Sequence, residues 1–179
     1  MARNFTLNFP ATALGPSFST TGPTYVNHGT TPFGRIGLAF SDGEDEAAST
    51  GSFIMPAEYT GSGTLKCDIA YYTASATAGD FAMAVVVEAI TDGDSTDMEA
   101  AQSFDLTATA TTKTVPGTAG HPDILTYTLT AKDSVAAGDI VRINLLIDVS
   151  EEEGSGGAGA SGRVDGDVYV ACVSFYEET

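Results

Sequence analysis

Residues 52–90 read SFIMPAEYTGSGTLKCDIAYYTASATAGDFAMAVVVEAI, and this stretch decides the fold that the sequence predicts. It contains two apolar runs separated by a short loop of small residues, 73–80. In both runs, apolar residues recur at every second position, which is typical of a β-strand with one buried face. They are Leu65, Cys67, Ile69 and Tyr71 in the first run and Phe81, Met83, Val85 and Val87 in the second. The stretch therefore predicts two long strands joined by a turn in the middle of a sheet.

The same alternation predicts further strands along the chain. The composition agrees, because 179 residues suffice for one core and a chain with 20 Gly and abundant Thr favours β structure. No window shows the apolar spacing of a helix. The predicted strands are 34–40, 52–55, 64–73, 81–90, 102–113, 124–130, 140–149 and 167–176. We predict an all-β fold, an eight-stranded antiparallel jelly-roll sandwich over residues 33–179.

Both cysteines fall inside predicted strands. In a jelly roll the first, eighth, third and sixth strands share a sheet, so the strands that carry Cys67 and Cys172 are expected side by side. The two thiols would then be near neighbours in the core. Free buried thiols are the expected state, and a disulfide is the alternative, which would require an oxidising compartment.

The first 32 residues differ from the rest of the chain. They hold four of the seven prolines, which disfavour helices and central strands, with apolar residues scattered between them. We predict an extended N-terminal arm, 1–32, that either lies across its own domain or wraps a neighbouring subunit. The residues predicted to dock on a partner, from this arm and the first strand, are Arg3, Phe5, Leu7, Phe9, Leu14, Phe18 and Arg35.

The charge is strongly negative and unevenly placed. The net charge is −17, and all 24 acidic residues lie from Asp42 onward. Such a surface repels phosphate groups, so we expect no binding to nucleic acid or to anionic membranes. The first 41 residues carry no acidic side chain, whereas the rest of the chain is acidic. This difference suggests different partners for the two parts.

No stretch indicates an active site. Neither His28 nor His121 has a serine or carboxylate at motif spacing, and G-x-S-x-G and H-E-x-x-H are absent. The acidic loops 41–49 and 91–99 could supply oxygen ligands to calcium, but the EF-hand pattern is missing, so solvated loops are favoured. A pair of carboxylates of the kind that glycosidases use remains an alternative, since a fold can bring distant loops together. We predict no catalytic residues, no cofactor and no metal.

A sugar-binding site is a possible alternative, but no feature of the sequence supports it. Carbohydrate-binding sandwiches present exposed aromatic rings on which sugars stack. This chain has no Trp, and its adjacent Tyr71 and Tyr72 lie in a predicted central strand. At least one of the two must face the core.

Four segments resemble small β-sandwich virion proteins of tailed bacteriophages, of the capsid decoration (cement) or head-fibre type. They are 55–65 (MPAEYTGSGTL), 72–80 (YTASATAGD), 115–120 (VPGTAG) and 134–139 (SVAAGD). The resemblance implies a structural protein without enzymatic activity, located in the virion after assembly in the host cytoplasm. It also implies a homo-oligomer, with a trimer favoured, and the major capsid protein or another virion protein as its partner.

These observations together predict a structural virion protein that decorates or cements a phage capsid through its arm and the base of its sandwich. Each arm side chain buried on the shell would contribute roughly 1.5–3 kcal/mol before ordering costs. One alternative is a receptor- or glycan-binding head or tail fibre domain of a virion, with its function in the loops. Another is a carbohydrate-active enzyme or binding module, which as an enzyme would require a cleft with paired carboxylates.

Overall fold

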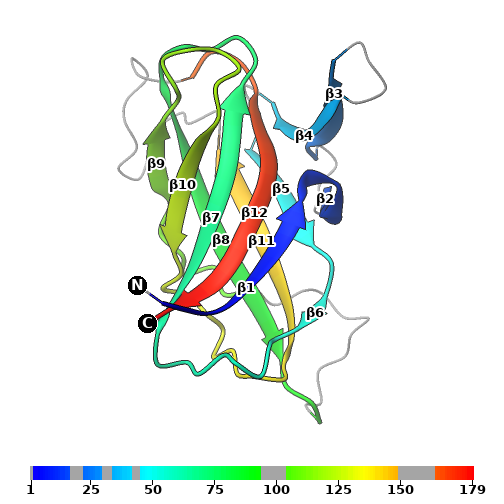
Figure 1. Cartoon of the computed structure of the whole chain (residues 1–179), viewed down its shortest axis with the longest axis vertical. Helices are drawn as coiled ribbons and strands as arrows, with labels where there is room; N and C mark the ends of the chain where they lie inside the picture. The colour runs from blue at the N-terminus through cyan, green and yellow to red at the C-terminus, as the bar shows by residue number, and fades with distance from the viewer. Residues whose placement is uncertain (1, 17–21, 30–33, 42–44, 94–103, 149–163) are drawn as a thin grey trace.

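The computed structural model describes residues 2–16, 22–29, 34–41, 45–93, 104–148 and 164–179 (Figure 1). In this part of the chain, twelve strands and one short 3-10 helix build two antiparallel sheets that pack face to face. The elements are β1 (Arg3–Pro10), η1 (Ala11–Ala13), β2 (Leu14–Pro16), β3 (Thr24–His28), β4 (Arg35–Phe40), β5 (Asp45–Thr50), β6 (Phe53–Ile54), β7 (Thr64–Thr73), β8 (Asp80–Ile90), β9 (Thr111–Thr114), β10 (Asp123–Thr128), β11 (Ile140–Asp148) and β12 (Val168–Glu178). The predicted all-β sandwich is confirmed, but the number of strands differs from eight.

The strand order agrees with the jelly-roll prediction. The front sheet, nearest the viewer in Figure 1, has the order β10-β7-β12-β4-β3, and β1 also pairs with β12. The back sheet has the order β2-β5-β11-β8-β9, and β6 also pairs with β11. The first, eighth, third and sixth predicted strands correspond to β4, β12, β7 and β10, and they share the front sheet as expected.

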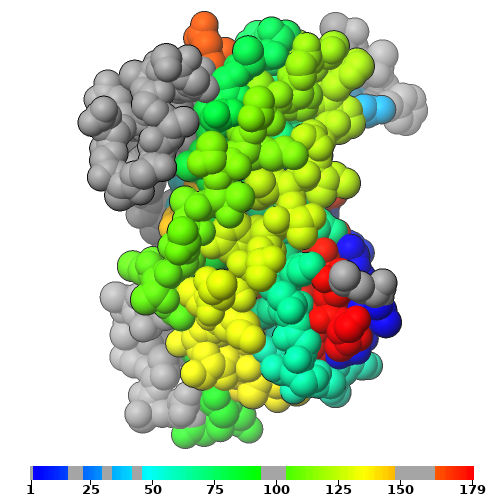
Figure 2. Space-filling view, turned by 90° about the vertical axis from the view of Figure 1, so that its left-hand side faces the viewer, coloured from blue at the N-terminus to red at the C-terminus, as the bar shows by residue number. Residues whose placement is uncertain are grey.

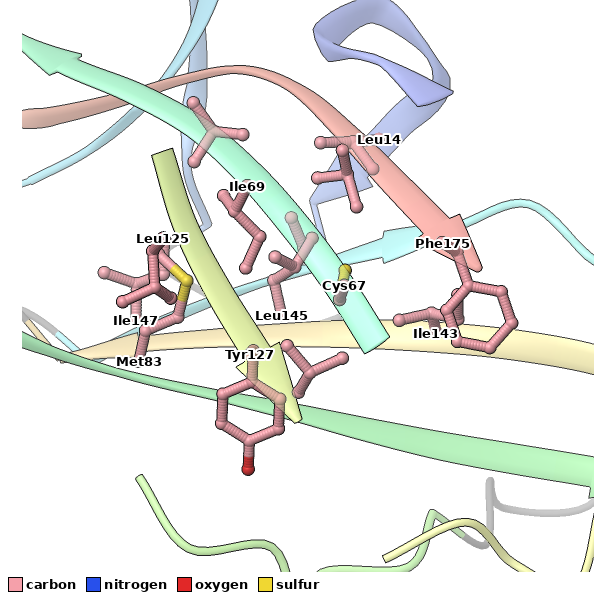
Figure 3. Packing of buried hydrophobic residues seen from close by; sticks show 14 of the residues in the cluster. Leu14, Cys67, Ile69, Met83, Leu125, Tyr127, Ile143, Leu145, Ile147 and Phe175 are labelled. Atoms are coloured by element: carbon pink, nitrogen blue, oxygen red, sulfur yellow. The ribbon is translucent and has the colours of Figure 1, made fainter. Parts of the chain in front are cut away.

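The core lies between the two sheets. Along β7 every second residue is buried, as the sequence predicts, and Tyr71 is fully buried. Figure 3 shows Cys67 and Ile69 of β7 facing Ile143 and Leu145 of β11. Each such side chain contributes about 1.5–3 kcal/mol by leaving water.

The described residues of the predicted arm form strands within their own chain. β1 pairs with β12 in the front sheet, β2 pairs with β5 in the back sheet, and β3 pairs with β4. Pro10 and Pro16 end two edge strands, where a missing amide hydrogen is tolerated. Thr179 donates its amide hydrogen to the carbonyl of Ala2 at 3.1 Å, and Figure 2 shows the red C-terminal residues beside the blue N-terminal ones. The described part of 1–32 is therefore built into the sandwich.

Two predicted elements differ in the structure. Half of the predicted acidic loop 41–49 belongs to β5, because Glu46 and Ala48 are buried beside β11. In the predicted strand 102–113, the described residues form a strand from Thr111 onward. The alternation there does not lead to burial, since Leu106 keeps 74% of its surface exposed.

The prediction for the two thiols is half right. β7 and β12 are neighbours, but Cys67 is buried whereas Cys172 is exposed, and both are free. The cause is an irregularity in register between Val170 and Cys172, which adds one residue to β12 and turns the next side chain outward. The prediction that both thiols lie together in the core is therefore wrong.

No helix among the described residues has the length and hydrophobicity needed to span a membrane.

Candidate ligand-binding site

The candidate site begins with the alternation of β7. Because Tyr71 points into the core, Tyr72 points to the outer face of the front sheet, where it is half-buried. Its cross-strand neighbour on β12 is Tyr169. Two tyrosines thus stand side by side on a face that would otherwise be open to solvent.

Three rings from three strands form a cluster on this face. The rings of Tyr72 and Tyr169 are stacked, with centroids 5.2 Å apart and planes inclined by 15°. His28 of β3 contacts both edge-on, with centroid distances of 5.4 Å to Tyr72 and 4.7 Å to Tyr169. Gly37 of β4 makes room for the cluster, since a Cβ there would lie 2.4 Å from the Tyr72 hydroxyl oxygen. The Tyr72 ring is therefore held in place by its surroundings.

Tyr72 lines a hollow of about 330 Å³, which we call the Tyr72 hollow. This volume lies at the small end of the range for sites that bind small molecules. Tyr169 is not among the lining residues, so it supports Tyr72 from outside the hollow. The lining comprises His28, Arg35, Ile36, Tyr72, Ala74, Gly120, Pro122 and Ala171.

Two polar atoms of the cluster are buried without a partner. Neither the Tyr72 hydroxyl nor Nε2 of His28 makes a hydrogen bond within the described part of the chain. A buried polar group without a partner costs about 1–3 kcal/mol, which a ligand or water with matching groups would recover. Burial raises the pKa of Tyr72 although the nearby Arg35 guanidinium lowers it, so the hydroxyl keeps its proton at neutral pH and can donate it.

Beyond the hollow, the outer face of the front sheet continues as a row of small and apolar side chains. The next cross-strand row joins the exposed Ile124 of β10, Ala70 of β7 and Cys172 of β12. The row after that contains Asp68, which accepts hydrogen bonds from Thr126 at 2.7 Å and, from further along the face, Tyr176 at 3.0 Å. A chain-like ligand bound in the hollow would thus contact small, mostly apolar side chains first and hydroxyl groups after them.

A second hollow, of about 410 Å³, lies between Tyr59, Asp105 and the 130–135 segment. Its two carboxylates already have partners. Asp105 accepts hydrogen bonds from Thr107, which lower its pKa, and Asp133 accepts one from the amide of Ala89 at 2.8 Å. These contacts hold loops together, so the second hollow offers a ligand fewer unpaired groups than the Tyr72 hollow does.

The residues predicted for docking are placed in different surroundings. Phe5 and Leu14 are buried in the core, and Leu7 and Phe9 pack against it. Arg3 forms an ion pair with Asp68 at 3.0 Å, and its guanidinium lies 3.6 Å from the ring centroid of Tyr176. Phe18 lies outside the described residues. Of the six that the structure describes, Arg35 alone lines the Tyr72 hollow.

Sequence reasoning did not find the hollow. His28 has no motif partner in the sequence, whereas the structure places it against two tyrosines. The alternation of buried and outward residues in β7 does indicate that Tyr72 points away from the core. Tyr169 of β12 points outward in the same way. Of the possible calcium ligands, Asp42, Glu44, Asp94 and Asp97 lie outside the described residues. Among the described ones, no three His, Cys, Asp or Glu residues gather into a metal-binding group.

No protein-family model and no curated protein matches this sequence. Solved structures share its fold. The isomalto-dextranase of Arthrobacter globiformis T6, complexed with panose, is 16% identical with a TM-score of 0.50, over 96% of this chain and 23% of that one. The C-terminal carbohydrate-binding module of LamC, a marine laminarinase from Zobellia galactanivorans, is 13% identical with a TM-score of 0.46, over 97% of this chain and 100% of that one. At 16% identity the likeness to the isomalto-dextranase shows a common fold alone, and this chain spans less than a quarter of that protein.

Proposed function

We propose that this protein is a glycan-binding β-sandwich module that acts without catalysis, and that its binding site is the Tyr72 hollow. A shared fold does not assign a function, so the proposal depends on the site. The observation that carries it is an aromatic ring, fixed by Tyr169 and His28, in a hollow whose buried polar atoms lack partners.

A sugar matches this combination of groups. The C–H groups of a sugar ring form an apolar face that packs on an aromatic ring, and its hydroxyls form a polar rim. The hollow supplies apolar surface from Ile36 and Pro122 beside Tyr72. Hydrogen bonds would come from the Tyr72 hydroxyl and His28 Nε2, which convergent sugar hydroxyls would satisfy.

The lining favours binding over hydrolysis. Glycoside hydrolysis ordinarily uses a pair of Asp or Glu side chains that flank the scissile bond. None of the described residues that line the Tyr72 hollow is acidic. The hollow can therefore hold a sugar but lacks, in the described part of the chain, the groups that would cleave it.

A glycan-binding module also fits one of the alternatives drawn from the sequence, a receptor-binding fibre domain of a virion. Capsid decoration depended on apolar arm residues free to dock, and Phe5 and Leu14 are instead buried in the core of their own chain. The virion location, the capsid partner and the trimer stay predictions. Light scattering on the purified protein would measure its oligomeric state directly.

The test is glycan binding by the wild-type protein and by variants of Tyr72. On an array of oligosaccharides, followed by calorimetry with the best binder, Tyr72→Ala is expected to weaken binding at least tenfold, because the stacking surface is lost. Tyr72→Phe keeps the ring and is expected to lose severalfold, through one hydrogen bond.

The matched control is Ile54→Ala, which removes an exposed apolar side chain from β6 in the other sheet. It is expected to bind like the wild type. The proposal fails if no glycan binds, or if Tyr72→Ala folds and binds unchanged.

A further inference from the structure

We propose that the Tyr72 hollow selects an acidic saccharide, one that carries a carboxylate, and that Arg35 is the residue that recognises the charge. This inference rests on the proposed glycan-binding function and specifies its ligand class. It follows from where the few positive charges of a strongly acidic protein are placed.

Most of the described basic side chains are already neutralised. Of the six, four form ion pairs with carboxylates, and the remaining two, Arg35 and Lys132, have no ion pair within the described residues. The four pairs are Arg3–Asp68, Lys66–Glu178, Lys113–Asp123 and Arg142–Glu88. In a chain of net charge −17, a guanidinium that meets no carboxylate among the described residues is available to an acidic ligand.

Arg35 stands where a ligand would meet it. It is the first residue of β4, directly opposite His28 of β3 in the register, and it lines the Tyr72 hollow. Its charge acts on the Tyr72 hydroxyl, so the guanidinium and the ring share one electrostatic environment. No acidic residue lines the hollow among those described, so no described carboxylate of the lining competes with a ligand for the guanidinium.

The chemistry of these groups matches a sugar acid. A guanidinium binds a carboxylate through two parallel N–H···O bonds, which are stronger than neutral hydrogen bonds. The Tyr72 hydroxyl, protonated at neutral pH, is a further donor. A uronic or sialic acid offers the apolar ring face for Tyr72 and the carboxylate for Arg35 in one unit. A neutral sugar would leave the guanidinium without a charged partner.

The negative charge of the whole protein does not prevent this contact. At physiological ionic strength, charges farther apart than about 8 Å are largely screened, whereas a direct guanidinium–carboxylate contact is screened much less. Binding measurements therefore belong at about 150 mM salt, where the long-range repulsion is weak.

The experiment compares acids with their own neutral esters. The probes are short oligomers of galacturonic, glucuronic, mannuronic and guluronic acid, each with its methyl ester, together with sialyllactose and lactose. Calorimetry is expected to show at least one acid binding tenfold or more tighter than its neutral counterpart. In Arg35→Gln this preference should vanish, so that the acid and its neutral counterpart bind with the same affinity.

Two control variants make the result specific. Lys132→Gln removes the other cation without an ion pair, which lines the second hollow, and should leave the preference unchanged. Arg35→Lys keeps the charge but loses the two-pronged geometry, and should retain a reduced preference. Arg35 is exposed, so thermal melting should show each variant folded.

The failures of the two proposals are distinguishable. If glycans bind but acids and esters bind alike, or if Arg35→Gln keeps the preference, the acidic-ligand inference is overturned and glycan binding stands. If no glycan binds in either form, both proposals fall.

Discussion

The two ends of the front sheet differ in how their polar groups are paired. At one end, both carboxylate oxygens of Glu177 accept hydrogen bonds: the amides of Thr60 and Gly63 donate at 3.0 Å each, and the side-chain amide of Asn4 donates as well. At the other end, the Tyr72 hydroxyl and His28 Nε2 have no partner among the described residues. Saturated groups hold a fold together, whereas unsaturated ones are free to bind a ligand. This difference separates the stabilising end from the binding end.

The largest expected effect is on stability, and it comes from the end of the sheet around Glu177, where the polar groups have hydrogen-bond partners. Glu177→Gln replaces a fully buried carboxylate that ties β12 to β1 and to the 60–63 turn. Because hydrogen bonds to a charged group are worth about 1.5–3 kcal/mol, we expect a loss of about 2–3 kcal/mol in the free energy of unfolding, measured by urea denaturation. Glycan binding should stay unchanged.

The adjacent Glu178→Gln is the control, since its partly exposed pair with Lys66 should contribute less than about 1 kcal/mol. Equal losses in the two variants would show that the Glu177 contacts are not special.

The same residue gives the stability a pH dependence. Burial alone would raise the pKa of Glu177, but the hydrogen bonds from Thr60, Asn4 and Gly63 outweigh it and lower the pKa to about 2. Since the folded pKa is below the ordinary value of 4.5, the stabilisation is complete above that value and is lost as the pH falls from about 4.5 towards 2. The difference in stability between wild type and Glu177→Gln should shrink over this window. A difference that stays constant between pH 5 and pH 2.5 would contradict this assignment.

A smaller effect is expected at the end around Tyr72, and it should appear in the affinity for a glycan. In Gly37→Ala the new methyl group would lie 2.4 Å from the Tyr72 hydroxyl oxygen, so the ring must move. We expect glycan binding to weaken about tenfold, with a loss of stability below about 1.5 kcal/mol, because the ring lies on the outer face. Removing the hydroxyl as well, in Gly37→Ala/Tyr72→Phe, should restore part of the affinity. If the double variant binds no better than the single one, Gly37 does not act through Tyr72.

The smallest effect concerns the row between the two ends. Cys172 is exposed there, whereas Cys67 lies buried in the core. Burial also raises the pKa of the Cys67 thiol, which makes it less reactive. In the folded protein a thiol reagent should therefore modify one cysteine per chain, and Cys172→Ser should reduce this to none. The stability of Cys172→Ser should equal that of the wild type. Rapid reaction of two thiols would contradict the outward turn of β12.

The sequence predicts the regular parts of the molecule well, and the reasons are physical. β7 occupies the predicted range 64–73, because a strand in the middle of a sheet has one buried face and so shows its period plainly. β5 was missed because it begins with the charged residues Asp45 and Glu46, and the burial of Glu46 depends on partners that lie far away in the sequence. The outward Cys172 was missed because one extra residue in β12 reverses the alternation without a local signal.

The candidate site was harder to predict than the fold. It draws His28 from β3, Arg35 from β4, Tyr72 from β7 and Gly120 from the loop before β10, and these residues meet only after both the order and the register of the front sheet are set. The orientation of Tyr72 could be predicted from alternation alone. The stacking of Tyr169 and the approach of His28 depend on strand neighbours that alternation does not specify.

The most direct test of the glycan-binding site is a crystal structure of the protein with its best-binding oligosaccharide. We expect a sugar ring packed on Tyr72, a hydrogen bond to the Tyr72 hydroxyl or to His28 Nε2, and further units running over Ala70 towards Asp68. A sugar seated in the second hollow, beside Lys132, or on the loops at the opposite end would contradict the assignment of the Tyr72 hollow as the binding site.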